Sequence, residues 1–251
     1  MKTILITGCS SGFGLATARH FLERDWKVIA AMRTPRADVL PRAPNLELLA
    51  LDVTKAESIS RAVDAVGPID ALVNNAGLGL LGVLEGTPME TARALFETNT
   101  FGPMALTRAF LPSFRARRAG VIVNVSSSTT LAPLPLLSTY TASKAALNAF
   151  TECLALELAP FGIRAHLVLP GMAPETAFGQ NARAQMAAQG VSVPEAWADF
   201  TRRTLERMAA RREGPITTAA DVAETIWRAV NDPASPLRLP AGADAVALSA
   251  L

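Results

Sequence analysis

Short apolar runs rich in leucine, isoleucine and valine alternate along the chain with longer segments of helical periodicity. Strands are expected at Thr3–Thr7, Lys27–Met32, Leu46–Leu51, Ala71–Asn74, Val121–Val125, Arg164–Val168 and Ala245–Leu248. Helices are expected at Gly12–Arg24, Lys55–Val66, Pro88–Arg118, Ser138–Pro160 and Thr218–Val230, with a less regular region at Met172–Arg212. Because buried strands separated by helices belong in parallel sheets, we predict an α/β, Rossmann-like, doubly wound fold with about seven parallel strands and helices on both faces.

Size and composition favour one domain over residues 1–251. Hydrophobic residues make up 50% of the chain and charged residues 18%, which is enough apolar material for one large core and an apolar cleft. Pro174 and Pro194 punctuate the segment after the sixth expected strand. We therefore expect residues 172–212 to form a substrate-binding insertion of loops and helices rather than a second domain.

Charge, hydropathy and cysteine content limit the partners and the compartment. A formal net charge of +2 creates no field that would favour nucleic acid, so a small-molecule partner is expected. No apolar run approaches the ~20 residues of a membrane span. Cys9 and Cys153 lie far apart without a Cys-x-x-Cys pattern, which favours a reducing, cytoplasmic setting. His20 and His166 have no companions at ligand spacing, so no metal site is expected.

A glycine-rich turn follows the first expected strand and opens the first expected helix. It reads Thr7-Gly8-Cys9-Ser10-Ser11-Gly12-Phe13-Gly14. Glycines let the backbone approach a pyrophosphate closely, and the N-terminus of a helix supplies free N–H donors and a positive dipole end. The alternative is a tight strand-to-helix turn without a ligand. The position of the turn between a strand and an amphipathic helix favours a dinucleotide site.

The end of the second strand indicates which dinucleotide is preferred. Doubly wound folds that bind NAD often carry an acidic residue there, which holds the ribose hydroxyls. Here Ala31-Met32-Arg33 has no acid, and the guanidinium of Arg33 pairs well with a phosphate. Ser11 offers a further hydroxyl donor from the neighbouring turn. We predict that NADP(H) is preferred and NAD(H) possible; the alternative is that Arg33 is merely solvated.

Tyr140 and Lys144 are four residues apart, so on a helix they lie on one face, one turn from each other. A nearby ammonium favours the phenolate form, so Lys144 is expected to lower the pKa of the Tyr140 phenol from its ordinary value of ~10. Such a phenol can donate a proton to a carbonyl oxygen or accept one from an alcohol. The alternative is an amphipathic helix whose Tyr and Lys are simply part of its surface.

A serine-rich segment, Ser126-Ser127-Ser128, ends the fifth expected strand after Asn124-Val125. A hydroxyl at this edge could hold a reacting carbonyl oxygen against Tyr140 and stabilise developing negative charge. The alternative is an ordinary loop at the end of a strand.

Together these segments resemble the short-chain dehydrogenase/reductase family over nearly the whole chain. The resemblance rests on the glycine-rich turn and on six further segments: Leu51-Asp52-Val53, Asn74-Asn75-Ala76-Gly77, Asn99 before Thr100-Phe101-Gly102, Asn124-Val125-Ser126-Ser127, Tyr140-Thr141-Ala142-Ser143-Lys144 and Pro170-Gly171. The turn and Ala31-Met32-Arg33 resemble the branch that includes 17β-hydroxysteroid and retinol dehydrogenases, a similarity shared with bacterial carbonyl reductases.

The resemblance implies a role for each matching residue. Tyr140 would be the acid/base, Ser127 would orient the carbonyl, Lys144 would hold the nicotinamide ribose, and Asn99 would support a proton relay through water. Ser127 stands thirteen places before Tyr140, the family's usual separation, although Ser128 could substitute. The implied cofactor contacts are Gly8, Ser10, Ser11, Gly12, Phe13, Gly14, Arg33, Asp52, Val53, Asn75, Ala76, Gly77, Tyr140, Lys144, Pro170, Gly171 and Thr176.

The sequence departs from the family pattern after Pro170. Glu175 stands where the family often has threonine, and Thr176 follows, as if one residue were inserted. Substrate contacts are expected from Leu78–Leu81, Leu131–Leu137 and Met172–Arg212, whose apolar content favours a mainly apolar ketone, aldehyde or alcohol. The family usually forms a homodimer or homotetramer, which is expected here. Two alternatives stay open: a non-catalytic dinucleotide-binding regulator or scaffold, and a related epimerase or dehydratase.

Overall fold

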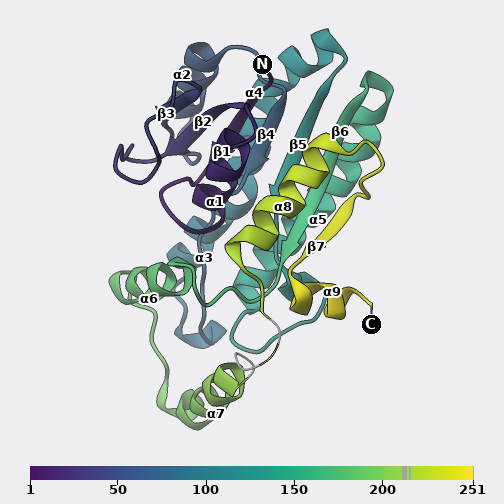
Figure 1. Ribbon diagram of the computed structural model, residues 1–251. Coiled ribbons are helices and arrows are strands. Elements are labelled where there is room, and N and C mark those ends of the chain that lie inside the picture. The colour runs from purple at the N-terminus through teal and green to yellow at the C-terminus, as the bar shows by residue number, and fades with distance from the viewer. Residues whose placement is uncertain (211–213, 215, 251) are drawn as a thin grey trace.

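A parallel sheet of seven strands forms the centre of the computed structural model, which describes residues 1–210, 214 and 216–250, without the side chain of Gln185. The strands are β1 Thr3–Thr7, β2 Lys27–Met32, β3 Leu46–Ala50, β4 Ala71–Asn74, β5 Gly120–Val125, β6 Ile163–Pro170 and β7 Arg238–Ala241. Their spatial order is β3-β2-β1-β4-β5-β6-β7, and every neighbouring pair is parallel (Figure 1). The order reverses between β1 and β4, where a doubly wound sheet binds its ligands.

Helices cover both faces of the sheet because successive strand residues point to opposite sides. On one face, Ile4 and Ile6 pack with residues of α1 Gly12–Leu22 and α8 Ala219–Asn231. On the other face, Leu5 packs with residues of α2 Ala56–Val66, α4 Gly102–Arg117 and α5 Ser138–Leu158. The predicted doubly wound fold with helices on both faces is confirmed (Figure 1).

The segment predicted as one helix at Pro88–Arg118 is divided into three parts. It consists of α3 Met89–Phe96, a π-helical turn η2 at Glu97–Phe101, and α4. A π-helical turn inserts a residue into the helical ladder and is often found at functional positions. Here the turn contains Asn99.

The predicted strand at Ala245–Leu248 is wrong. The seventh strand is β7, and the later segment forms α9 Ala243–Ser249. In β7 the side chains of Leu239 and Ala241 are buried, and Pro240 is tolerated because β7 lies at the edge of the sheet. The segment after Gly242 is rich in alanine, the strongest helix former, which favours a helix here.

The region between β6 and α8 is more regular than predicted. It contains α6 Phe178–Ala188, a short 3₁₀ turn η5 at Glu195–Trp197, and α7 Ala198–Ala210. We call residues 172–210 the insertion; the last two residues of the predicted range, 211 and 212, lie outside the described residues. Figure 1 shows that α6 lies near the carboxyl ends of the strands and that α7 stands away from the sheet.

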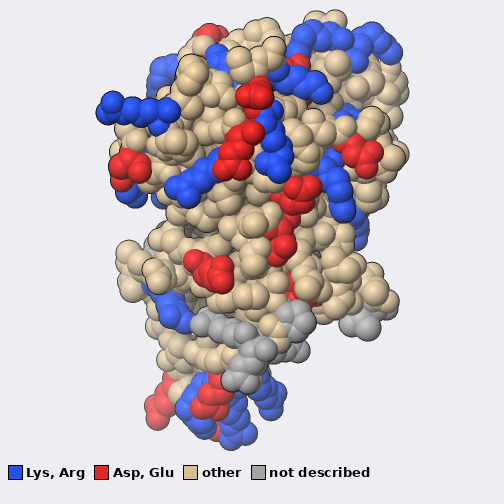
Figure 2. Space-filling model, viewed as in Figure 1, with Lys and Arg blue, Asp and Glu red and all other residues tan. Residues whose placement is uncertain are grey.

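Acidic and basic side chains are interspersed on the face of the molecule that Figure 2 presents. On α7, Arg202 forms ion pairs with Asp199 and Glu206, and Arg203 pairs with Asp199. Within the described part of the chain, no helix is both long and apolar enough to cross a bilayer.

Candidate active site

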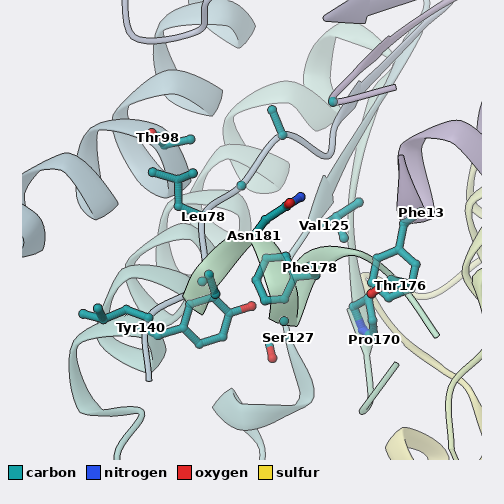
Figure 3. Close-up of a pocket in the computed structure, with 18 of the residues that line it drawn as sticks. Phe13, Leu78, Thr98, Val125, Ser127, Tyr140, Pro170, Thr176, Phe178 and Asn181 are labelled. Carbon is teal, nitrogen blue, oxygen red and sulfur yellow. The ribbon is translucent and has the colours of Figure 1, made fainter. Parts of the chain in front are cut away.

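One cleft of about 1660 Å³ opens along the carboxyl ends of the strands. Its wall is built from the loops that follow β1 to β6, together with residues of the insertion and of α9. Figure 3 shows part of this wall, with Tyr140, Ser127, Phe178 and Pro170 around the same space. All the predicted site residues line the cleft except Gly14 and Asn99. The topology therefore brings together segments that are far apart in the sequence.

The glycine-rich turn forms a cradle in which side chains would not fit. Gly8 has φ = +75°, and a Cβ there would lie 2.9 Å from Asn75 Nδ2. Gly14 does not line the cleft; a Cβ on it would lie 2.5 Å from the same Nδ2, so its role is close packing behind the turn. Asn75 Nδ2 in turn donates to the Thr7 carbonyl oxygen over 2.9 Å. This arrangement holds the backbone of the turn next to the cleft.

The N-terminus of α1 is open to an anionic ligand. Ser11 is the N-cap residue, but its hydroxyl makes no capping hydrogen bond, and the first turn of the helix holds no acidic residue. Ser10, Ser11, Gly12 and Phe13 line the cleft beside this helix end. The free backbone N–H groups and the helix dipole together favour a phosphate group here.

Charged groups gather where β2 and β3 end. Arg33 is exposed and lines the cleft, as do Asp52 and Lys55. Burial alone would raise the pKa of Asp52, but hydrogen bonds from the Thr54 N–H and hydroxyl, with the charges of Arg33 and Lys55, hold it below its ordinary value. Sequence reasoning missed Lys55, because a lysine just before a helix carries no distinctive signal. This end of the cleft presents two cations beside one carboxylate.

Tyr140 and Ser127 meet at the other end of the cleft. Tyr140 lies in the first turn of α5 and is 8% exposed, and Ser127 follows β5. Burial raises the pKa of Tyr140 to about 12, although the hydrogen bond from the Ser127 hydroxyl offsets part of this effect. Ser127 Oγ also accepts from the Thr129 N–H and hydroxyl, over 3.2 Å and 3.1 Å, which fixes its position. Figure 3 shows the Tyr140 and Ser127 side chains in the same part of the cleft, with the Phe178 ring near Tyr140.

Lys144 lies one turn further along α5 and is almost fully buried. Its Nζ atom donates to the Val125 carbonyl oxygen over 2.8 Å. Burial lowers the pKa of Lys144 to about 8. The prediction that Lys144 lowers the pKa of Tyr140 is wrong for this structure, because desolvation of the phenol outweighs any effect of the ammonium.

Asn99 supports the site from behind the wall of the cleft. Its Oδ1 accepts from the Leu78 N–H over 2.8 Å, and its Nδ2 donates to the Leu78 carbonyl oxygen and to Ser143 Oγ, both over 3.0 Å. Ser143 Oγ donates onward to the Tyr140 carbonyl oxygen over 2.7 Å. The π-helical turn thus joins the loop after β4 to the start of α5.

A polar cluster joins the start of the insertion to Thr217, just before α8, and to Asp244 on α9. The Gly171 N–H donates to Thr217 Oγ1 over 3.0 Å, and the Thr217 N–H donates to the Met172 carbonyl oxygen over 2.9 Å. The Asp244 carboxylate accepts from the Met172 N–H and from the Thr217 hydroxyl, each over 2.6 Å. A Cβ on Gly171 would collide with this carboxylate. Sequence reasoning missed Asp244, which lies just before the segment predicted as a strand and has no local pattern that marks it.

Thr176 lies opposite the glycine-rich turn, near the start of the insertion. Its hydroxyl donates to the Ala173 carbonyl oxygen over 2.9 Å, and a Cβ on Gly12 would lie 3.6 Å from Thr176 Cβ. The apparent extra residue after Pro170 therefore leaves Thr176 on the wall of the cleft.

Much of the wall of the cleft is apolar. The predicted contributors are present from each of the three segments, and α9 adds two residues that were not predicted. The apolar side chains of the wall include Leu78, Leu80, Leu81, Leu134, Leu137, Met172, Phe178, Met186, Met208, Ala247 and Leu248. Such a wall suits an uncharged substrate with a hydrocarbon or ring substituent.

Comparisons with known proteins agree with this geometry. The sequence model of the short chain dehydrogenase family matches residues 2–187. The chain is 44% identical over 181 residues to an uncharacterized oxidoreductase, YusZ, of Bacillus subtilis, and 40% identical over 181 residues to retinol dehydrogenase 8 of Homo sapiens. Each match covers 68% of this chain, and 64% and 58% of the respective relative, so the chain spans less than two thirds of their length.

Solved structures share the fold. A short chain dehydrogenase from Burkholderia cenocepacia in complex with NADP superimposes with a TM-score of 0.78 and 28% identity, covering 100% of this chain and 93% of the other. The expected similarity to the branch with retinol dehydrogenases is confirmed by the human relative. From its family match, its relatives and its fold, the chain belongs to the short-chain dehydrogenase/reductase family.

Proposed function

We propose that the protein is an NADP(H)-dependent oxidoreductase that interconverts a mainly apolar ketone or aldehyde and its alcohol. The observation that carries this proposal is the meeting of the Tyr140 and Ser127 hydroxyls in an apolar recess of the same cleft that contains the glycine cradle. A protein that only bound a dinucleotide would not need the hydroxyl groups of Tyr140 and Ser127 to lie together in this way.

The residues present fit a nicotinamide dinucleotide. The glycine cradle and the open N-terminus of α1 suit the pyrophosphate, Asp52 and Val53 suit the adenine, and Lys144 suits the nicotinamide ribose hydroxyls. When bound, this cofactor supplies or takes up the hydride. Arg33, with Ser11 and Lys55 near it on the wall, favours the 2′-phosphate of NADP(H), while NAD(H) remains possible.

The chain's own residues would handle the proton. With its pKa at about 12, the Tyr140 phenol is protonated at neutral pH and can donate to a carbonyl oxygen. The hydroxyl of Ser127, held by Thr129, can donate to the same oxygen and stabilise negative charge on it. Asn99 acts as a positioning residue, because its amide ties Leu78 to the start of α5. In this protonation state the site is better suited to carbonyl reduction than to alcohol oxidation.

The family resemblance also supports a homodimer or homotetramer formed through α4 and α5. Exposed apolar side chains are present at Phe101, just before α4, and at Leu156 on α5, with exposed fractions of 51% and 78%. Both cysteines are free, which supports a reducing, cytoplasmic setting. Light scattering tests the assembly, because a stable monomer at assay concentrations would reject it.

An activity panel tests the proposed function. Aromatic ketones, aldehydes and steroids are offered to the protein with NADPH and with NADH, and the absorbance of the reduced nicotinamide is followed. We expect turnover of at least one apolar carbonyl compound, with a higher kcat/KM for NADPH. Absence of turnover across the panel, despite cofactor binding, would contradict the proposal.

A further inference from the structure

The insertion packs against the segment after β4 at three glycines of that segment. A Cβ on Gly79 would lie 2.8 Å from ring atoms of Phe178 and 3.1 Å from Ala182 Cβ, and a Cβ on Gly82 would lie 3.2 Å from Val191 Cγ1. A Cβ on Gly86 would collide with the Ser192 carbonyl oxygen. Successive glycines of this loop therefore contact successive residues of the insertion, and at each of these positions the loop has no side chain in the way.

Hydrogen bonds hold the two segments together along the same line. The Ser192 N–H donates to the Gly86 carbonyl oxygen over 2.9 Å. The Leu81 N–H donates to Met186 Sδ over 3.4 Å, and Trp197 Nε1 donates to Glu85 Oε2 over 2.6 Å. Contacts at both ends and in the middle fix the register of α6 on this loop.

This register sets the position of Phe178 beside the reactive phenol. The ring centroids of Phe178 and Tyr140 are 6.0 Å apart, with the ring planes at 60°. Figure 3 shows the Phe178 ring between Tyr140 and the part of the wall that holds Thr176 and Pro170. Phe178 lines the cleft and is 42% exposed, so its ring is not part of the buried core.

We propose that Gly79 and Phe178 act as a pair that determines substrate specificity, with Phe178 limiting the size of the substituent beside Tyr140 and Gly79 fixing the depth of the Phe178 ring. This inference rests on the proposed carbonyl chemistry at Tyr140. A methyl group at position 79 would enter space that the Phe178 ring occupies, and real Cβ atoms do not approach other atoms so closely. Because the obstacle is the end of a flexible side chain, the ring would shift while the fold remains.

The first test detects the contact between Phe178 and Tyr140 by NMR, so it does not depend on enzymatic activity. Tyr140 is the chain's only tyrosine, so tyrosine labelled with ¹³C in its ring gives NMR signals from this residue alone. We expect Phe178→Ala and Gly79→Ala each to shift these signals, because a neighbouring aromatic ring is removed or displaced. Gly179→Ala is the matched control, since a Cβ there meets no atom within 4 Å apart from its chain neighbours and the backbone of its own helix, and the Tyr140 signals should not change. Unchanged signals in both test variants would overturn the proposal.

The second test measures selectivity between two methyl ketones, one with a short alkyl substituent and one with a phenyl substituent. We expect Phe178→Ala to raise the ratio of kcat/KM, phenyl over alkyl, by about tenfold, the scale on which apolar pockets discriminate by size. Gly79→Ala should change this ratio in the wild-type background and leave it unchanged in the Phe178→Ala background, because the two residues act as one unit. Independent, additive effects of the two substitutions would overturn the proposal.

The two proposals fail in different ways. If the wild-type protein turned over no member of the activity panel, the proposed function would fail, and the specificity proposal would be tested instead by the ratio of the two ketones' dissociation constants, measured from the Tyr140 NMR signals. If Gly79→Ala folded poorly, Phe178→Ala would decide the matter alone, since its half-exposed side chain is not needed for the core. An unchanged ratio in that variant would contradict a role in specificity.

Discussion

The side-chain nitrogen of Lys144 donates a hydrogen bond to the backbone carbonyl oxygen of Val125, at the end of the strand that leads to Ser127. This bond ties α5 to β5, so the ammonium and the two hydroxyl groups share one rigid support. It also means that Lys144 is held in place before any ligand arrives. Its remaining N–H groups are then available for the ribose hydroxyls of the proposed cofactor.

The buried position of Lys144 predicts a pH dependence of cofactor binding. Burial lowers the pKa of Lys144 to about 8, so the amine is charged below that pH and loses its proton as the pH rises through it. We expect the affinity for NADPH to begin to fall between pH 7 and 8, as the amine loses its proton, and to fall more steeply above pH 8. Fluorescence titration of NADPH between pH 7 and 9.5 measures this. In Lys144→Met the affinity should be lower and flat over the same range; an equally steep decline there would assign the titration to another group.

Arg33 is predicted to select NADPH over NADH. Because a charge-assisted hydrogen bond is worth roughly 1.5–3 kcal/mol, Arg33→Ala should weaken NADPH binding by about 10-fold to 100-fold and leave NADH binding nearly unchanged. Dissociation constants for both cofactors measure the effect. Arg36→Ala is the matched control, since Arg36 lies nearby, pairs with Asp38 and does not line the cleft. Equal losses of NADPH and NADH affinity in Arg33→Ala would speak against a phosphate-binding role.

Asp244 is predicted to hold the insertion in place. Asp244→Ala leaves the Met172 N–H and the Thr217 hydroxyl without their carboxylate partner, so we expect KM for the ketone to rise several-fold. The free energy of unfolding should fall by about 1 kcal/mol, because the part-buried Met172 N–H loses its partner while the Thr217 hydroxyl keeps the Ala241 carbonyl oxygen. Steady-state kinetics and urea denaturation measure both quantities. Asp64→Ala, on the exposed face of α2, should change neither; an unaltered KM in Asp244→Ala would mean that the insertion is held without this residue.

The sequence predicted the sheet and the main components of the site because their patterns are local. A run such as Thr3–Thr7 followed by glycines, or Tyr140 four residues before Lys144, can be recognised without knowledge of distant segments. The doubly wound topology then requires the ends of the strands to meet at one edge. For these reasons, six of the seven strands could be anticipated, and all the predicted site residues except Gly14 and Asn99 line the cleft.

The features that were missed depend on long-range packing. The contact of Asp244 with Met172 joins residues 72 positions apart, and nothing in the local pattern of either residue indicates it. The raised pKa of Tyr140 follows from burial by several elements, whereas the spacing to Lys144 alone suggests a lowered value. Likewise, the packing of Phe178 against Gly79 joins the start of α6 to the loop after β4, and only the folded chain defines how these two segments align.

The substitution Tyr140→Phe tests the central claim most directly, because it keeps the ring and removes only the hydroxyl that is proposed to transfer the proton. We predict that the variant binds NADPH with the affinity of the wild type and loses catalytic turnover of a reactive ketone by a factor of about 10²–10⁴, the usual contribution of general acid–base catalysis. Turnover within a few-fold of the wild type, with cofactor binding intact, would contradict the assignment of Tyr140 as the proton donor.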